Sequence, residues 1–358
     1  MKRGDLAVAP RERPNPRLRR PSPRARRYGV ALALTALLVA TATAWHVFSC
    51  PLPKEAPPVT VFVEPGSSTA QVADLLHKNG IIRYPLAFRV LSRIMRADGR
   101  LQSGEYRFEP GVFAWDAITA LKTGQVVYYS VTLREGLTVE QIAALIEESG
   151  FGSAEEILEL CKDPSLLPVP EPPAGLGKVR YPLEGYLFPD TYYFRKGMTS
   201  KEIVQMMTKR FSAVFTEELV REAEKAGMTP HDVATLASIV ESEAYAPEER
   251  PVIAAVYLNR LKIGMKLDAD PTVVYGLGEE PGYALLWRDL DSDSPYNTYR
   301  QPGLPPGPIG SFGEASLKAV LAPADVGYLY FVAKKDGTHA FARTLAEHNR
   351  NVAAHRGD

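Results

Sequence analysis

The chain has few of the residues that build disulfide frameworks or metal sites. Its 358 residues include only two cysteines, Cys50 and Cys161, so the sequence implies no disulfide framework. Its six histidines have no paired ligand spacing, and no metal or other cofactor is expected. A phosphate-binding glycine loop, a nucleophile elbow and a Cys–His pair are also missing from the sequence. Stability must therefore come from buried apolar surface, and the chain is long enough for two or three hydrophobic cores.

Charge is absent between Tyr28 and Ser49. An uncharged stretch of this length crosses a hydrocarbon layer of ~30 Å as one helix. Tyr28 and Trp45 lie near its two ends, where interfacial aromatic residues are common. Ten basic residues within residues 1–27 predict a cytoplasmic N-terminus. The sequence thus predicts a single-pass protein of the cytoplasmic (inner) membrane with its remainder in the periplasm. A cleaved signal peptide is less favoured, because the leading tail is long and has no small-x-small cleavage site.

The net charge of zero is a cancellation between two parts of the chain. The 42 basic and 42 acidic residues balance, but residues 1–27 hold ten basic and two acidic ones, which leaves 32 basic and 40 acidic residues beyond them. A mildly acidic exported part has no basic face with which to neutralise phosphates, so nucleic acid is not expected as a partner. The basic tail is interpreted as a topology signal that contacts anionic lipid headgroups.

A weak internal repeat occurs at an offset of 70 residues. Residues 59–76 align without gaps to residues 129–146, and the shared positions include Gly66 with Gly136 and Gln71 with Gln141. Each copy predicts a strand, a glycine turn, a Ser or Thr helix start and an amphipathic helix ended by glycine. This order is similar to a LysM module, which binds N-acetylglucosamine chains. A generic strand–helix unit that recurs because it packs well explains the repeat equally well.

Glu241 lies near the end of a predicted helix that starts at Thr229 and Pro230, a capping residue and a residue suited to the first helical position. At about 100° per residue, the apolar residues form one stripe, with Glu241 on one margin and Glu243 on the opposite margin. A carboxyl at the edge of a buried face is half desolvated, which favours its protonated form and suits a general acid. The ordinary alternative is a solvated glutamate that flanks a core helix.

Two further segments are typical of a glycan groove. Residues 183–194 combine aromatic residues with Glu184 and Asp190, and aromatic faces stack on sugar rings while carboxylates bind their hydroxyls. An aromatic core edge is nearly as good an explanation. Residues 303–310 form a loop rich in glycine and proline that loses little freedom on folding. Between these two segments, residues 201–224 are predicted to form a single helix that serves as scaffold.

Several motifs that follow one another in the chain carry a resemblance to a known family. They are Glu184-Gly185, Phe188-Pro189-Asp190-Thr191, Ile239-Val240-Glu241-Ser242-Glu243, Asn259-Arg260-Leu261, Asp270-Pro271-Thr272-Val273, Tyr296-Asn297-Thr298-Tyr299, Gly303-Leu304-Pro305-Pro306-Gly307 and Tyr328-Leu329-Tyr330-Phe331-Val332. Together they resemble the YceG-like endolytic murein transglycosylases over roughly residues 55–353. The resemblance implies a membrane-anchored enzyme that cleaves nascent peptidoglycan strands, with Glu241 as its catalytic glutamate. Endolytic rather than terminal cleavage is implied by the resemblance alone.

The sequence patterns and the family resemblance together predict an α+β fold. It has one N-terminal transmembrane helix, a LysM-like module and a mixed lysozyme-like catalytic domain. The predicted organisation is a cytoplasmic tail (1–27), the transmembrane helix (28–49), a Pro-rich stalk (50–57), a LysM-like module (58–128), a second strand–helix unit with a connector (129–178) and the catalytic domain (179–358). The short stalk favours substrate engaged close to the membrane, where peptidoglycan synthases are possible partners.

One carboxylate suffices for the chemistry expected of such an enzyme. Glu241 and Glu243 point about 160° apart on a helix, so they cannot form the acid pair of a hydrolytic muramidase. In a lytic transglycosylase Glu241 protonates the glycosidic oxygen and then removes the proton of the substrate's C6 hydroxyl, which closes a 1,6-anhydro ring.

The other site residues have predicted supporting roles. Tyr296, Asn297 and Tyr299 are the candidates that orient the substrate's N-acetyl group, and Glu184 and Asp190 are candidate sugar ligands. Glu243, paired with an arginine such as Arg260, and Asp270 are expected to support the site. The competing functions are a hydrolytic muramidase and a non-enzymatic, membrane-anchored peptidoglycan-binding scaffold.

Overall fold

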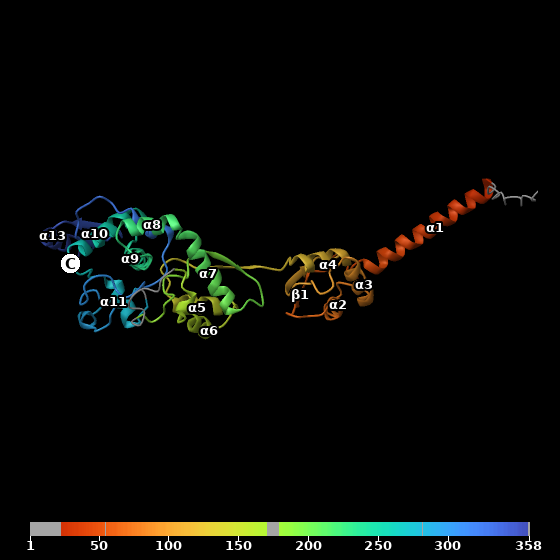
Figure 1. Ribbon diagram of the computed structural model, residues 1–358, viewed down its shortest axis with the longest axis horizontal. Coiled ribbons are helices and arrows are strands. Elements are labelled where there is room, and N and C mark those ends of the chain that lie inside the picture. Colours follow the sequence, from red (N-terminus) through yellow and green to blue (C-terminus); the bar gives the residue numbers. More distant parts are fainter. Residues whose placement is uncertain (1–22, 54, 170–178, 281, 357–358) are drawn as a thin grey trace, which may run out of the picture. The chain divides into compact units, whose positions relative to one another are not determined.

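The computed structural model describes residues 23–53, 55–169, 179–280 and 282–356 (Figure 1). It is an α+β structure with two compact units, Met1–Val126 and Val127–Asp358. Most of the predicted basic tail, residues 1–22, lies outside the described residues, and so do residues 170–178 of the Pro-rich connector. The two units are described in turn.

Helix α1 (Pro23–Phe48) contains the uncharged stretch (Figure 1). Within it, Arg26–Phe48 is long and apolar enough to cross a membrane, and it is the one such helix among the described residues. Large apolar side chains along it, including Leu32, Leu38 and Trp45, are exposed. Length and composition therefore agree with the predicted span over residues 28–49, and a signal sequence would have the same properties.

The first unit continues after α1 as a β-α-α-β-α fold. Strand β1 (Val59–Val63) is followed by α2 (Thr69–Lys78), α3 (Pro85–Ile94), β2 (Gly104–Phe108) and α4 (Ala114–Thr123). Strands β1 and β2 pair antiparallel, with Val61 opposite Tyr106. Alternate residues of both strands point inward and pack with α2, α3 and α4 on a core that includes Val61, Tyr106 and Leu121.

The second unit begins with a related β-α-α-β arrangement. Its elements are β3 (Tyr129–Thr132), α5 (Val139–Glu148), α6 (Ala154–Cys161), the short 3₁₀ helix η1 (Pro164–Leu166) and β4 (Thr191–Phe194), and β3 pairs antiparallel with β4. The sequence repeat has a structural basis in the helix starts. Ser68 before α2 and Thr138 before α5 each form a capping box with a glutamine three residues later. Gly66 and Gly136 both adopt positive φ angles, 78° and 80°, in the turns that precede these caps.

The remainder of the second unit is mainly helical. It comprises α7 (Ser200–Val214), α8 (Glu217–Lys225), α9 (Pro230–Glu243), η3 (Pro247–Glu249), α10 (Arg250–Lys262), α11 (Asp270–Leu277), η4 (Trp287–Asp291), α12 (Glu314–Leu321), the antiparallel pair β5 (Tyr330–Ala333) and β6 (His339–Ala342), and α13 (Leu345–Arg356). One prediction is corrected here: the single helix expected over residues 201–224 is two helices, α7 and α8. Phe215 leaves the helical conformation, and Thr216 has the extended backbone of an N-cap residue before α8, although its side chain makes no capping hydrogen bond.

Helix α9 is the central element of the core in this region. Thr229 caps it as predicted, since its hydroxyl accepts from the Asp232 amide and the Asp232 carboxylate accepts from the Thr229 amide. The burial differs from the predicted single stripe, because every residue from Val233 to Val240 is buried. Small residues such as Ala234, Ala237 and Ser238 let α12, α10 and α11 approach it from several sides. The two ends of α9 therefore leave the core, and the C-terminal end is the one that carries Glu241 and Glu243.

Candidate active site

Glu241 lies in the last turn of α9 and is almost fully buried. Its side chain is 5% exposed, and both carboxylate oxygens accept hydrogen bonds. Arg250 donates from Nη2 to Oε1 at 2.7 Å, and the backbone amide of Gly313 donates to Oε2 at 2.9 Å. Arg250 is the first residue of α10 and reaches Glu241 through its side chain, whereas Gly313 is the N-cap residue of α12 and donates its backbone amide. The guanidinium of Arg250 and the positive N-terminal end of α12 therefore stabilise a negative charge on Glu241.

Arg250 is itself held in a fixed orientation. Its side chain is 11% exposed, and its Nε donates to the hydroxyl of buried Ser316 at 3.0 Å. A buried ion pair is stable only where its charges are well paired and further hydrogen bonds satisfy the remaining donors. Glu241, Arg250 and Ser316 meet this condition, and they fix the carboxylate in one position beside the core.

A second carboxyl, Glu135, faces the same place from the loop between β3 and α5. A side chain at residue 313 would collide with the carboxylate of Glu135. Glu135 therefore lies directly against Gly313, the residue whose backbone amide donates a hydrogen bond to Glu241. Burial raises the pKa of Glu135, the negative charge of Glu241 adds to this, and Arg250 opposes it. Glu135 therefore keeps a proton at a higher pH than an ordinary glutamate does.

Backbone hydrogen bonds hold the Glu135 loop against the start of α12. The Gly136 amide donates to the carbonyl of Ser311 at 2.9 Å, and the Ser311 amide donates to the carbonyl of Leu137 at 2.8 Å. The Ser311 hydroxyl also accepts from the Leu137 amide at 3.1 Å. A Cβ atom at Gly310 would come within 3.2 Å of the Gly136 carbonyl, so this close approach favours glycine at residue 310.

A cavity of about 560 Å³ opens beside these carboxyls. Ser242, the residue after Glu241 in α9, lines it together with Ile309, and Glu135 lines it from the loop between β3 and α5. Tyr275 and Asp270 of α11 form part of its remaining wall. Glu241 itself is not one of the lining residues, but its neighbour Ser242 is. The cavity mixes apolar and polar side chains, the usual composition of a ligand site.

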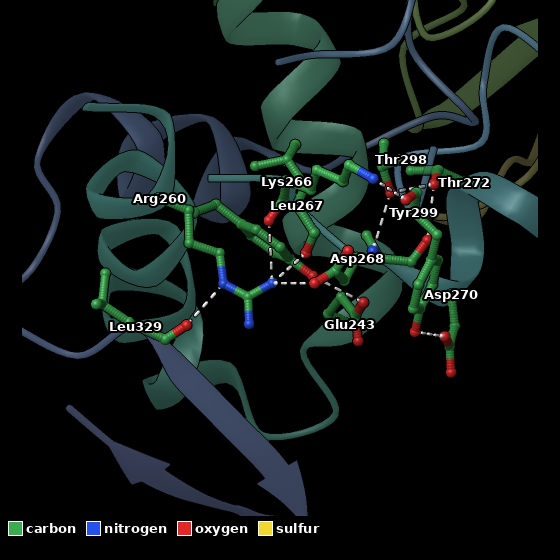
Figure 2. Close-up of polar contacts among 12 residues, drawn as sticks. Glu243, Arg260, Lys266, Leu267, Asp268, Asp270, Thr272, Thr298, Tyr299 and Leu329 are labelled. Atoms are coloured by element: carbon green, nitrogen blue, oxygen red, sulfur yellow. Dashed lines mark hydrogen bonds and ion pairs between the residues drawn. The ribbon is translucent and has the colours of Figure 1, made fainter. Parts of the chain in front are cut away.

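A second, smaller cavity of about 330 Å³ lies on the other side of the α9 terminus. Glu243 lines it, and its carboxylate accepts from the hydroxyl of Tyr257 at 2.9 Å. Figure 2 shows Arg260 of α10 directed at the carbonyl oxygens of Leu267 and Leu329 and at the carboxylate of Asp268. The two cavities share one wall residue, Asp270, whose carboxylate accepts from the hydroxyl of Tyr299 at 2.6 Å.

Some of the residues predicted at the substrate site line a cavity or depression, and others are bonded inside the protein. Tyr299 and Asp270 line a cavity, and Tyr296 lines a shallow depression beside Tyr275. Asn297 is fully buried, with its amide nitrogen bonded to the carbonyls of Leu290 and Ser292.

The other two predicted sugar ligands differ in exposure. Glu184 is buried, whereas Asp190 is partly exposed, pairs with Arg210 at 2.6 Å and accepts from the Thr191 amide at the start of β4. The internal bonds of buried Asn297 and Glu184 do not fit direct contact with a glycan, whereas the carboxylate of Asp190 remains accessible to a ligand.

Glu184 links the β3–β4 part of the unit to the wall of the larger cavity. Its Oε1 accepts from the amide of Val139 at 3.0 Å, and its Oε2 accepts from the hydroxyl of Tyr275 at 3.0 Å. Burial raises the pKa of Glu184 from 4.5 to about 8, although both of these hydrogen bonds oppose the shift. The carboxyl is therefore protonated in the folded chain over a pH range in which it is ionised in the unfolded chain.

This shift predicts a pH-dependent stability. Between pH 4.5 and about 8 the folded state holds a proton on Glu184 that the unfolded state has lost, so the free energy of unfolding falls as pH rises through this window. Glu184→Gln mimics the protonated form and is expected to flatten the fall. The measurement is the unfolding temperature across this window, with Glu148→Gln on the exposed face of α5 as control. A Glu184→Gln profile as steep as that of the wild-type chain would contradict the assignment.

Three residues of this site were not found in the sequence analysis. Arg250 and Gly313 lie 9 and 72 positions from Glu241 in the chain, and neither belongs to a motif used above. Glu135 had a usable signal, because it occupies the position of Pro65 in the other copy of the repeat. A charged residue directly before the glycine turn of one copy, where the other copy has proline, marks a place where the two copies diverge.

Comparison with known proteins adds an independent finding. The model of the YceG-like family matches residues 61–354. A Bacillus subtilis protein named endolytic murein transglycosylase is 36% identical over 302 residues, which cover 82% of this chain and 83% of the relative. A Streptococcus pneumoniae protein of the same name is 29% identical over 329 residues, 83% of this chain and 58% of the relative.

A solved structure is similar over the same part of the chain. The crystal structure of a YceG-like protein from Listeria monocytogenes is 32% identical and aligns with a TM-score of 0.58. The alignment covers 82% of this chain and 99% of that structure.

Proposed function

This chain belongs to the YceG-like family, and we propose that it is a lytic transglycosylase that cleaves the glycan strands of peptidoglycan. The observation that carries this proposal is the carboxylate of Glu241, which Arg250 and the Gly313 amide hold in place next to Ser242, a residue that lines the larger cavity. Relatives named endolytic murein transglycosylase support the same conclusion.

Glu241 is the acid and base of the proposed reaction. In the described conformation its oxygens accept from Arg250 and from the Gly313 amide, which is the arrangement of a base. In the acid step a proton on Glu241 passes to the glycosidic oxygen, and the bond from that oxygen to C1 of N-acetylmuramic acid breaks. The carboxylate then accepts the proton of the C6 hydroxyl as that oxygen bonds to C1. No water is consumed, and the new end is a 1,6-anhydro sugar.

Glu243 does not take part as a second carboxylate in this mechanism. It lines the smaller cavity, and its carboxylate accepts a hydrogen bond from the hydroxyl of buried Tyr257. Both observations favour a structural role for Glu243. Asp270 separates the two cavities and holds Tyr299 in the wall of the smaller one. A strand that entered both cavities would pass the C-terminal end of α9, where Ser242 lines the larger cavity and Glu243 lines the smaller one.

Glu135 gives weight to one competing function, the hydrolytic muramidase. That reaction uses two carboxyls, one to protonate the leaving oxygen and one to assist attack at C1. Glu135 and Glu241 both adjoin Gly313, Glu135 lines the larger cavity, and the raised pKa of Glu135 suits a group that holds a proton. The two reactions give different products, so they are separable by experiment.

The remaining assignments concern the parts around the site. We assign α1 to a single transmembrane anchor of the cytoplasmic membrane, with a cytoplasmic N-terminus and the rest of the chain in the periplasm. We propose a LysM-like role in holding glycan for the β-α-α-β units, and we assign the lysozyme-like catalytic domain to the region around α9. In this arrangement the enzyme cuts new strands near the membrane beside peptidoglycan synthases and so ends their elongation.

The product of the reaction tests the proposal. Full-length protein incubated with purified sacculi is expected to release fragments with 1,6-anhydro ends, which mass spectrometry identifies because each is one water lighter than a hydrolysed end. Reducing ends in their place would establish a muramidase. Glycan binding without any new ends would establish an anchored scaffold.

A further inference from the structure

Helix α3 has a second apolar face that the described residues of its own unit leave exposed. Phe88 and Ser92 point inward and are buried, and Phe88 belongs to the core shared with α2 and β2. Leu86, Val90 and Ile94 recur every four residues on the other side, where they are 69%, 55% and 72% exposed. Four-residue spacing places the three side chains in one row along the helix. A soluble surface rarely exposes a continuous apolar row of this kind.

This row continues directly from the end of α1. Val47 and Phe48 of α1 and Tyr84, Leu86 and Val90 at α3 line one apolar groove with a volume of about 480 Å³. The junction is fixed, because the Cys50 amide donates to the Val112 carbonyl at 3.1 Å and Ser49 forms a β-bridge with Phe113. Figure 1 shows α1 leaving the first unit beside α3. The exposed row therefore begins where the apolar stretch of α1 ends.

Aromatic residues gather at the same junction. Trp45 packs edge-on against Phe113 with their ring centroids 4.7 Å apart, and Phe113 stacks on Trp115 at 4.3 Å. Tyr84 lies 6.3 Å from His46 by ring centroids. Trp45, Trp115 and Tyr84 remain exposed. Tryptophan and tyrosine with one apolar and one polar end are enriched at the level of lipid headgroups.

The charge beside the row has the sign that attracts anionic lipids. Residues 83–100 contain Arg83, Arg89, Arg93, Arg96 and Arg100. Their one acidic residue, Asp98, lies 3.8 Å from Arg93. Arg89 and Arg93 are exposed and each precedes an apolar residue of the row, so long cationic side chains border the apolar surface. This local excess of positive charge contrasts with the acidic balance of the exported chain.

We propose that α3 lies in the headgroup region of the outer leaflet of the cytoplasmic membrane, with Leu86, Val90 and Ile94 inserted toward the acyl chains. An interfacial helix needs an apolar face, a cationic border and aromatic neighbours, and all three occur here at the exit of the proposed span. The inference rests on the membrane anchor assigned to α1. Its consequence is that the first unit is held against the bilayer at two places instead of turning freely about α1.

The test places a fluorescent probe on single cysteines in the full chain, with Cys50→Ala and Cys161→Ala removing the native thiols. The purified protein is reconstituted in vesicles of phosphatidylethanolamine and phosphatidylglycerol that contain lipids with a nitroxide quencher at the headgroup or in the acyl chain. Probes on Leu86→Cys, Val90→Cys and Ile94→Cys are expected to be quenched several-fold more strongly by the shallow quenchers than a probe on Asp74→Cys, an exposed residue of α2.

A fourth probe, on Leu37→Cys in α1, separates the two proposals. Strong quenching at residue 37 by acyl-chain nitroxides with no excess quenching at residues 86, 90 and 94 would overturn the interfacial role of α3 and leave the anchor intact. Absence of quenching at residue 37 would overturn the anchor itself. Probes on α3 that are shielded from water but not quenched by lipid would indicate contact with a second copy of the chain, and would also overturn the proposal.

The arginines provide a second variant that leaves the apolar row unchanged. Arg89→Glu with Arg93→Glu is expected to reduce the quenching of the Val90→Cys probe in vesicles that contain phosphatidylglycerol, because attraction to the anionic surface is lost. In vesicles of phosphatidylcholine alone the same pair of substitutions is expected to have a much smaller effect. An equal effect in both lipids would contradict the role given to charge.

Discussion

Glu241→Gln is expected to abolish strand cleavage while the chain still folds and binds glycan. A general acid–base group contributes about 10²–10⁴-fold to a rate, and here one group serves both steps, so we expect a loss at or beyond the upper end of that range. The glutamine oxygen can still accept from Arg250, but its amide nitrogen would face the Gly313 amide, so a modest loss of stability is also expected. The measurement is the release of 1,6-anhydro ends from sacculi.

Glu243→Gln is the matched control for this experiment. It lies two residues along the same helix end, and its amide oxygen still accepts from Tyr257, so cleavage is expected to persist. Cleavage by Glu241→Gln at the wild-type rate would show that another group is the acid. Glu135, which faces the same cavity, would then be the next residue to test.

Arg250→Leu is expected to give the largest loss of stability of any single change near the site. It leaves Glu241 buried with one oxygen unpaired, and breaking a buried ion pair from one side costs about 3–5 kcal/mol. Cleavage is also expected to fall sharply, because Glu241 loses the contact that fixes its position. Thermal unfolding of the full chain in detergent, together with the sacculus assay, measures both effects.

A double variant and a surface control make this prediction specific. Combining Glu241→Gln with Arg250→Leu removes the unpaired charge, so the double variant is expected to be more stable than Arg250→Leu alone. Arg210→Leu breaks a comparably short but exposed pair with Asp190 and is expected to cost less than about 1 kcal/mol. A loss for Arg250→Leu no greater than for Arg210→Leu would show that burial of the pair is not what matters.

Local features of the site could be predicted from the sequence, and long-range ones could not. The start of α9 follows from Thr229, Pro230 and Asp232, which lie within four residues of one another and act through backbone geometry. The repeat likewise predicted matching helix starts, because capping depends on neighbours in the chain. The break between α7 and α8 was missed because the apolar pattern continues through Phe215, and the Thr216 cap was the only local sign of it.

The surroundings of the carboxyls depend on residues far apart in the chain. Glu184 was predicted at a groove surface, yet the segment that carries it lies under α5, whose first amide it accepts. Asn297 was predicted to face substrate, and its side chain instead donates hydrogen bonds to the carbonyls of Leu290 and Ser292 in the preceding loop. Both side chains are polar, so their type suggested exposure. Their burial depends on partners that no periodicity reveals, such as Tyr275, 91 positions from Glu184.

The hydrogen bonds between Ser311 and the Gly136–Leu137 segment hold residues 134–138 in the wall of the larger cavity. The similarity of the repeat that carries them to a glycan-binding module suggests an accessory unit that could be exchanged between relatives. Exchanging it would also replace the Glu135 loop and remove the hydrogen bonds that hold the segment before α12. A change in residues 134–138 is therefore expected to alter the position of Gly313, whose amide donates to Glu241. Chimaeras that join a foreign repeat to residues 179–358 would have to restore the Ser311 contacts before they could regain turnover.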